Sequence, residues 1–147
     1  MECVIFIGIQ ASGKSTFYKE RFFDSHLRIN LDMLKTRHRE AIYIAASLQA
    51  KQPFVLDNTN PTAEDRSRYI ALAKEHKFLI TGYYFEPDVA ESLRRNELRS
   101  GKGRVPEVGI FSVRKQLQMP DFREGFDSLY TVVSQNGEFQ VTEWPEP

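Results

Sequence analysis

The sequence has one cysteine, no net charge and no apolar run that approaches the roughly 20 residues needed to span a bilayer. Cys3 has no partner for an internal disulfide, so we expect a small buried hydrophobic residue there. No basic segment precedes a long apolar stretch, which predicts neither export nor membrane insertion and favours a cytoplasmic location. The 20 basic and 20 acidic residues balance, so bulk charge alone cannot hold a long nucleic acid.

Signs of disorder and of repeats are lacking too, since 41% of the residues are hydrophobic and glycine and proline are few. A chain of 147 residues is large enough for one core, so we expect residues 1–147 to form a single domain. Charge is nevertheless uneven along the chain. Residues 35–39 and 94–104 are basic, whereas residues 120–147 are acidic.

One motif organises what is present. Gly8 to Thr16 follows the pattern G-x-x-x-x-G-K-[ST], between an apolar run over residues 4–7 and a helical pattern. In that context the motif predicts a phosphate-binding P-loop, whose backbone N–H groups face a nucleotide at a helix N-terminus. The predicted nucleotide-binding residues of the motif are Gly8, Gln10, Ala11, Ser12, Gly13, Lys14, Ser15 and Thr16.

Two further roles follow from P-loop chemistry. Lys14 is expected to contact the β- and γ-phosphates, and the Ser15 hydroxyl the Mg²⁺ that bridges them. Asp57 ends an apolar run at residues 53–57 and is expected to face the same ion. The alternative for Asp57 is a carboxylate that only caps a turn.

Hydrophobic periodicity alternates between strand and helix. Strands are predicted at residues 4–7, 27–30, 53–57, 78–85 and 129–133, with a closing hairpin around 139–141. Helices are predicted at residues 14–23, 33–49 and 62–76, with others starting near 86–88 and at Pro106. This alternation predicts an α/β fold of three layers, with a central parallel sheet of about five strands. Ligands are then expected at the carboxyl ends of the strands, where Gly8, Asp32 and Asp57 fall.

The kind of P-loop protein can be narrowed. The chain has no Asn-Lys-x-Asp segment to read guanine, which argues against a GTPase. An acid after the second strand and an arginine-rich loop between late helices are the layout of a small kinase, with a mobile lid at about residues 99–106. Asp32 could instead be the N-cap of the helix predicted at 33–49.

Five segments resemble the kinase domain of polynucleotide 5′-kinases, over residues 4–129, most strongly the kinase half of animal polynucleotide kinase/phosphatase. They are Gly8 to Thr16, Asn30-Leu31-Asp32, Leu56 to Pro61, Arg94-Arg95-Asn96 with Arg99, and Val113 to Gln116. The resemblance implies that Asp32 is the general base on the 5′-hydroxyl and that Arg99 is a lid arginine on the transferring phosphate. With Lys14 these are the expected catalytic residues. Arg95 is expected to bind nucleotide, and the acceptor to meet Asp32, Lys35, Arg37, Asn58 and Asn60.

The chain departs from that family's pattern at three positions. The family usually has proline and glycine where Gln10 and Ala11 stand, and arginine where Leu31 stands. No Asp-x-Asp occurs, so a companion phosphatase is not expected in this sequence.

The expected activity is transfer of the ATP γ-phosphate, with Mg²⁺, to a short single-stranded 5′-hydroxyl nucleic-acid end. Two alternatives stay open: a kinase for a small hydroxylated metabolite or antibiotic, and a nucleotide-binding module without transfer activity. Neither a membrane nor an obligate protein partner is expected.

Overall fold

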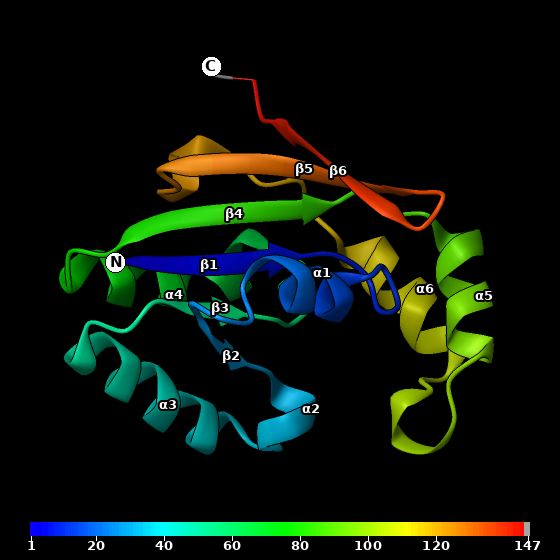
Figure 1. Cartoon of the computed structure of the whole chain (residues 1–147), viewed down its shortest axis with the longest axis horizontal. Helices are drawn as coiled ribbons and strands as arrows, with labels where there is room; N and C mark the ends of the chain where they lie inside the picture. The colour runs from blue at the N-terminus through cyan, green and yellow to red at the C-terminus, as the bar shows by residue number, and fades with distance from the viewer. Residues whose placement is uncertain (146–147) are drawn as a thin grey trace.

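A computed structural model describes residues 1–145. Within them the strands are β1 (Glu2–Ile7), β2 (Leu27–Ile29), β3 (Phe54–Leu56), β4 (Leu79–Phe85), β5 (Ser128–Gln135) and β6 (Glu138–Glu143). In this part of the chain they form one six-stranded sheet in the order β2-β3-β1-β4-β5-β6 (Figure 1). All neighbours pair in parallel except β5 and β6, which are antiparallel. The predicted fold class, a mainly parallel sheet in an α/β protein, is confirmed.

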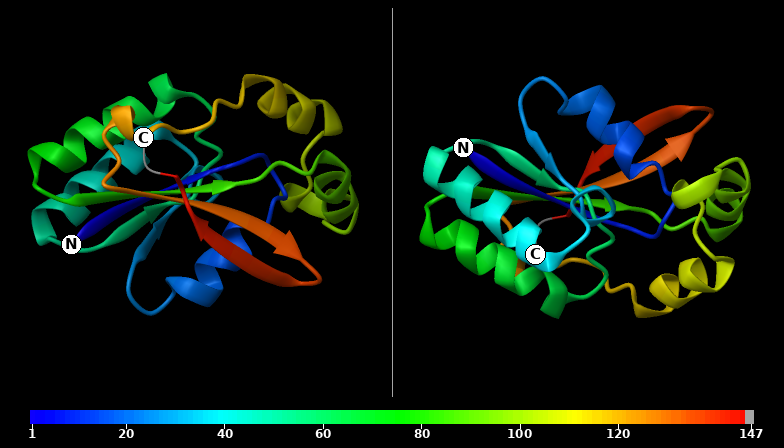
Figure 2. Two further views of the ribbon diagram at one scale, coloured as in Figure 1. Left: turned by 90° about the horizontal axis from the view of Figure 1, so that it is seen from above. Right: turned by 90° about the horizontal axis from the view of Figure 1, so that it is seen from below.

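Helices cover both faces of the sheet. They are α1 (Lys14–Arg21), α2 (Leu31–Leu34), α3 (Arg37–Ala50), α4 (Ala63–Glu75), α5 (Val89–Glu97) and α6 (Glu107–Gln116), with short 3₁₀ turns η1 (Gly101–Gly103) and η2 (Phe122–Glu124). Figure 2 shows α1 on one side of the sheet and α3 and α4 on the other.

The alternation of side chains along β1 explains the three layers. Val4 and Phe6 pack with Phe17 of α1 in one apolar cluster. Cys3, Ile5 and Ile7 pack in the other cluster, with residues of α3 and α4. Cys3 is fully buried there, as predicted, and burial raises the pKa of its thiol. The central strand therefore holds the two helical layers together and delivers the P-loop at its end.

The helix predicted at residues 33–49 is wrong as a single element. The structure has α2 and α3 instead, because Lys35 takes a positive φ of 77° between them. Each helix has its own N-cap: the Asn30 side chain accepts from the Met33 N–H, and the Thr36 side chain from the Arg39 N–H. The alternative role of Asp32 as the N-cap of that helix is thus also wrong.

The fourth strand runs through its glycine. A Cβ at Gly82 would lie 2.6 Å from Leu129 Cδ2 and 2.8 Å from Phe126 Cε1, so glycine makes room for these core side chains. The predicted hairpin is confirmed as β5 and β6, with positive φ at Asn136 and Gly137 in the turn.

The ends of the central strands meet near the P-loop. The Gly8 N–H donates to the Thr59 oxygen at 3.0 Å, and the Asp57 N–H donates to the Ile29 oxygen at 2.9 Å. In Figure 1, α5 and α6 lie beyond this end of the sheet. No helix in residues 1–145 is long and apolar enough to cross a membrane.

Candidate active site

The P-loop connects the central strand to α1. Gly13 has a φ of 96°, and a Cβ there would lie 2.8 Å from Arg95 Nη1 and 3.0 Å from the Phe139 ring. Ala11 also has a positive φ, 56°, which is the conformation that favours the glycine of the resembled family. Gly13 is the N-cap residue of α1 and makes no side-chain cap hydrogen bond. The first N–H groups of α1 are therefore available to an anion.

A cavity of about 280 Å³ lies against the P-loop, between α2, the loop after β3 and the segment after α5. Nine predicted site residues line it: Gln10, Ala11, Gly13, Lys14, Ser15, Asp32, Asp57, Asn58 and Arg99. The fold thus brings the catalytic and metal-binding candidates to one place from four separate parts of the chain. The Gln10 Oε1 atom is buried without a hydrogen-bond partner among the described residues.

Lys14 is buried in this cavity wall. Its Nζ donates to the Ile9 oxygen at 2.6 Å and to the Gly8 oxygen at 3.2 Å. Burial lowers the pKa of the ammonium from 10.5 to about 8, against the opposing effect of Asp57 and with a further lowering by Arg99. An anion placed beside Lys14 would offset that burial cost.

Ser15 and Asp57 suit a magnesium ion. The Ser15 hydroxyl donates to Asp57 Oδ2 at 3.1 Å, so two hard oxygen donors lie side by side next to the P-loop. The described residues contain no group of three or more metal-ligating acids, histidines or cysteines. That donor set fits Mg²⁺, which is commonly held by one or two protein ligands together with the phosphates of a nucleotide.

Arg28 of β2 contacts the same pair and was missed in the sequence. Its Nε donates to Asp57 Oδ2 at 2.7 Å and its Nη2 to Ser15 Oγ at 3.0 Å. The only signal in the sequence is a basic residue between the apolar Leu27 and Ile29 in a strand that precedes a candidate acid.

Asp32 lies on α2 and is exposed to the cavity. Two asparagines fix the start of α2. Asn30 Nδ2 donates to the backbone oxygen of Asp57 at 2.6 Å, and Asn58 Oδ1 accepts from the Leu31 N–H at 2.9 Å. Because other residues cap the helices, the carboxylate of Asp32 is available to a ligand.

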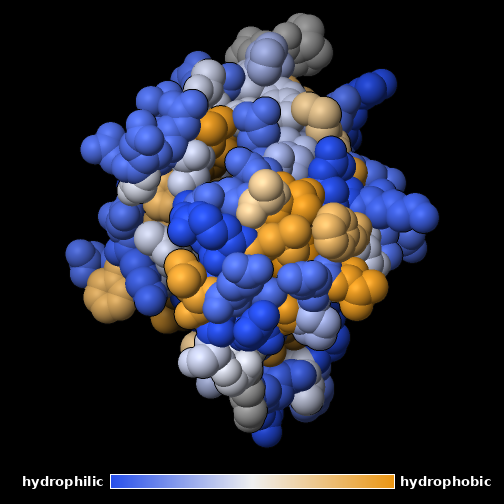
Figure 3. All heavy atoms as spheres, turned by 90° about the vertical axis from the view of Figure 1, so that its right-hand side faces the viewer, coloured by the Kyte–Doolittle hydropathy of each residue, from blue (hydrophilic) through white to orange (hydrophobic). Residues whose placement is uncertain are grey.

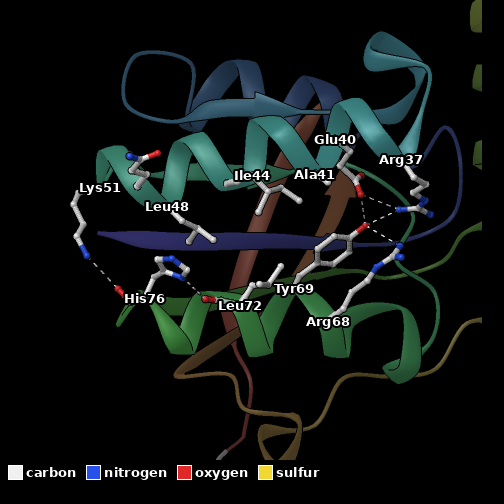
Figure 4. A pocket seen from close by; sticks show the side chains of 12 residues that line it. Arg37, Glu40, Ala41, Ile44, Leu48, Lys51, Arg68, Tyr69, Leu72 and His76 are labelled. Carbon is white, nitrogen blue, oxygen red and sulfur yellow. Dashed lines mark hydrogen bonds and ion pairs between the residues drawn. The ribbon is translucent and has the colours of Figure 1, made fainter.

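Three predicted acceptor-binding residues lie outside the lining of this cavity. Lys35 is exposed, and its Nζ donates to the backbone oxygen of Asp32 at 2.7 Å. Asn60 is buried, with its Nδ2 donating to the Phe6 oxygen at 2.8 Å, so it ties the loop after β3 to β1. Arg37 lines a different cavity, of about 580 Å³, between α3 and α4 (Figure 4).

In that second cavity the guanidinium of Arg37 is engaged. Its Nη1 donates to Glu40 Oε1 at 3.1 Å and to the Tyr69 hydroxyl at 2.6 Å. Glu40 is 2% exposed, and its Oε2 accepts from Asn58 Nδ2 at 3.1 Å. Arg37 therefore neutralises a buried carboxylate that also holds Asn58 in place.

Thr16 and Arg95 line a third cavity, of about 360 Å³, which shares Gly13 and Arg99 with the first. Arg95 Nη2 donates to Ser134 Oγ at 2.8 Å, which joins α5 to β5. Gly8 and Ser12 line neither of these two cavities, but both contact Lys14.

The segment around Arg99 is closed by Asn96, which belongs to a segment of the family resemblance but was given no role there. Asn96 is 1% exposed; its Nδ2 donates to the Val105 oxygen at 2.7 Å and its Oδ1 accepts from the Val105 N–H at 2.8 Å. Figure 3 shows apolar side chains gathered within a hydrophilic rim at this end of the molecule. Leu98 and Val108 are among the exposed apolar residues of the α5–α6 region.

A parallel sheet with a P-loop between its central strand and the next helix defines a P-loop nucleotide-binding fold. A family model described as an AAA domain matches residues 24–120, which begin after the P-loop. The chain belongs to this family of P-loop kinase domains, as the resemblance of its motifs predicts.

Curated relatives extend the comparison. A bifunctional polynucleotide phosphatase/kinase of Schizosaccharomyces pombe is 30% identical over 135 residues, which is 89% of this chain and 33% of that protein. A putative bifunctional polynucleotide phosphatase/kinase of Acanthamoeba polyphaga mimivirus is 32% identical over 138 residues, with the same two coverages. The chain thus spans about a third of the length of these relatives.

Solved structures show the fold. Kti12 of Chaetomium thermophilum, in complex with ADP-AlF3, has a TM-score of 0.67 at 16% identity, over 89% of this chain and 88% of that one. A gluconokinase of Sinorhizobium meliloti 1021 has a TM-score of 0.57 at 16% identity, over 90% and 82%. At such identities the likeness extends to the architecture alone.

Proposed function

We propose that the chain is an ATP-dependent kinase that phosphorylates the 5′-hydroxyl of a short single-stranded nucleic-acid end. The observation that carries this proposal is one cavity lined by Lys14, Asp32 and Arg99. This cavity brings together a lysine that can bind phosphate, a carboxylate that caps no helix, and a second cation. The names of the two curated relatives favour a polynucleotide acceptor.

The chemistry is an in-line displacement at the γ-phosphorus. The Asp32 carboxylate accepts the proton of the acceptor hydroxyl, whose oxygen forms the new bond to phosphorus. The bond from phosphorus to the β,γ-bridging oxygen breaks, and ADP leaves with that electron pair. Lys14 and Arg99 place positive charge where the phosphoryl oxygens gain negative charge.

Ser15 and Asp57 would hold Mg²⁺, which neutralises phosphate charge when bound. In this proposal residues 1–147 act as one kinase domain, and the segment at 99–106 is a lid that closes over the phosphates and excludes water. Asn58 accepts a hydrogen bond from the Leu31 N–H at the start of α2, and in this way it orients Asp32.

Asp32→Asn tests the proposal. The amide fills the same space but accepts a proton poorly, so turnover on a 5′-hydroxyl oligonucleotide should fall by about 10²–10⁴. The affinity for ATP and the unfolding temperature should stay close to wild type. Transfer of labelled γ-phosphate to the oligonucleotide measures the first, and calorimetry the other two.

Asp24→Asn is the matched control, since it makes the same change at an exposed carboxylate that lines none of the cavities around the P-loop. Wild-type turnover in Asp32→Asn would rule out Asp32 as the base. Nucleotide binding with no transfer to an oligonucleotide, a nucleoside or a sugar acid would instead identify a binding module.

A further inference from the structure

Arg28 engages both oxygen atoms that suit the magnesium ion. Its Nε lies 2.7 Å from Asp57 Oδ2, and its Nη2 lies 3.0 Å from Ser15 Oγ. The Ser15 hydroxyl in turn lies 3.1 Å from the same Asp57 oxygen. The guanidinium of Arg28 therefore forms hydrogen bonds with both candidate metal ligands, which are also hydrogen-bonded to each other.

The charges explain why this arrangement forms. The side chain of Asp57 is 1% exposed, so its negative charge depends on cations of the protein. Arg28 forms the ion pair with Asp57, and Lys14 is the other cation that interacts with it.

A guanidinium and a Mg²⁺ ion would compete for the lone pairs of these atoms. Mg²⁺ takes oxygen ligands, and Ser15 Oγ and Asp57 Oδ2 already accept hydrogen bonds from Arg28 at 3.0 Å and 2.7 Å. Two cations that share the same ligands also repel each other in a partly buried site. The side chain of Arg28 is 28% exposed, which leaves it a path toward solvent.

We propose that Arg28 is a built-in competitor of Mg²⁺ at Ser15 and Asp57. Binding of a Mg²⁺–nucleotide complex displaces the guanidinium, and the strength of the Arg28–Asp57 pair sets the Mg²⁺ concentration that binding requires. The inference rests on the proposed function only in that the P-loop binds nucleotide with Mg²⁺. It needs neither the acceptor nor the transfer step.

The first test measures binding of a non-hydrolysable ATP analogue while Mg²⁺ is titrated. Arg28→Gln removes the competing charge, so the Mg²⁺ midpoint should fall by about tenfold, the scale of a hydrogen-bonded charge pair. Arg28→Lys keeps the charge but lacks the planar fork that spans both oxygens, so its midpoint should lie between the two. Arg21→Gln, an equal charge change at an exposed position on α1, should leave the midpoint unchanged.

The second test uses Mg²⁺ alone and thermal unfolding. Arg28→Gln leaves the buried Asp57 carboxylate without its ion-pair partner, so the unfolding temperature should fall in metal-free buffer. Millimolar Mg²⁺ should restore part of that loss, and should raise the unfolding temperature more in Arg28→Gln than in wild type or Arg21→Gln.

An unchanged or higher Mg²⁺ midpoint in Arg28→Gln would overturn the proposal, and a higher one would show that Arg28 supports nucleotide binding. If Arg28→Gln does not fold, the midpoint of Arg28→Lys decides in the same way. A lower midpoint in Arg28→Gln, for a protein that transfers no phosphate, would leave this inference standing and reject the proposed function. Normal transfer with no shift would reject only the competitor.

Discussion

The surroundings of Lys14 bring the pKa of its ammonium group close to neutral pH. Burial lowers the pKa of its ammonium to about 8, and three oxygen atoms of the P-loop residues Gly8, Ile9 and Ser12 lie within hydrogen-bond distance of Nζ. The charged form is the one that binds phosphate, so the same burial that shapes the site makes nucleotide binding sensitive to alkaline pH.

We expect the affinity for ATP to fall as pH rises above 8, by up to tenfold per unit, because binding must then take up a proton at Lys14. Isothermal titration calorimetry between pH 7 and 10 in buffers of different ionisation enthalpy measures the affinity and the proton uptake. In Lys14→Met both effects should be absent. Equal proton uptake in Lys14→Met and wild type would assign the titration to another group.

The stability effect at Lys14 has the opposite sign. Its pKa is about 8 in the folded chain and 10.5 in the unfolded chain, so the unfolded chain binds more protons between these values. The contribution of Lys14 to the free energy of unfolding should therefore increase from pH 8 to pH 10.5. Denaturant unfolding of wild type and Lys14→Met across that window gives the difference.

Among the elements, the segment between α5 and α6 is fixed at its base. Both backbone polar groups of Val105 bond to the Asn96 side chain, and Arg99 lies within the loop thus closed, with its Nη1 donating to the Gly103 oxygen at 3.2 Å. In the proposed lid motion the two ends of the loop would keep their positions, and Arg99 would stay beside the cavity that it lines.

Asn96→Ala should cost about 1–3 kcal/mol of stability, since it leaves two backbone groups of a buried contact without partners. It should also lower kcat more than it raises the KM for ATP, because Arg99 loses a defined position at the transferring phosphate. Thermal unfolding and steady-state kinetics measure the two effects, with Glu97→Ala as the exposed neighbouring control. Normal kcat in a destabilised Asn96→Ala would show that the loop needs no fixed base for catalysis.

At the scale of the whole molecule, internal ion pairs neutralise several of the basic residues that could otherwise contact a nucleic acid. Arg94 and Arg95 both contact Glu91, and Arg37 contacts the buried Glu40. Near Asp32, Lys35 and Arg39 donate only to backbone oxygens within residues 1–145. A neutral protein with so few available cations can neutralise about two or three phosphates of a strand.

We therefore expect the KM for a single-stranded 5′-hydroxyl oligonucleotide to rise with salt, with a log–log slope of about 1.5–2. Lys35→Glu combined with Arg39→Glu should raise that KM and reduce the slope, but leave the KM for ATP unchanged. Arg123→Glu, on η2 and outside the lining of the cavities around the P-loop, is the control. A KM for the acceptor that responds neither to salt nor to the reversals would favour a small hydroxylated metabolite.

The sequence by itself determined the parts of this protein that depend on local chemistry. The continuous apolar run along β1 requires cover on both faces of the sheet, and the spacing of Gly8, Gly13 and Lys14 specifies a phosphate loop at the end of that strand. Strand-end acids such as Asp57 could be assigned to the same edge because parallel strands end together.

Only the tertiary structure decided which side chains meet. The order β2-β3-β1 brings Arg28 beside Asp57 and Ser15, which are 29 and 13 residues away in the chain, and the fold places Arg37 against Glu40 and Tyr69 instead of in the cavity with Asp32. The periodicity of apolar residues indicates which face of a helix or strand is buried, but it does not identify the residues that this face contacts. Buried polar groups take the nearest available donor or acceptor, and that neighbour is fixed by the order of the strands and by the packing of the helices upon them.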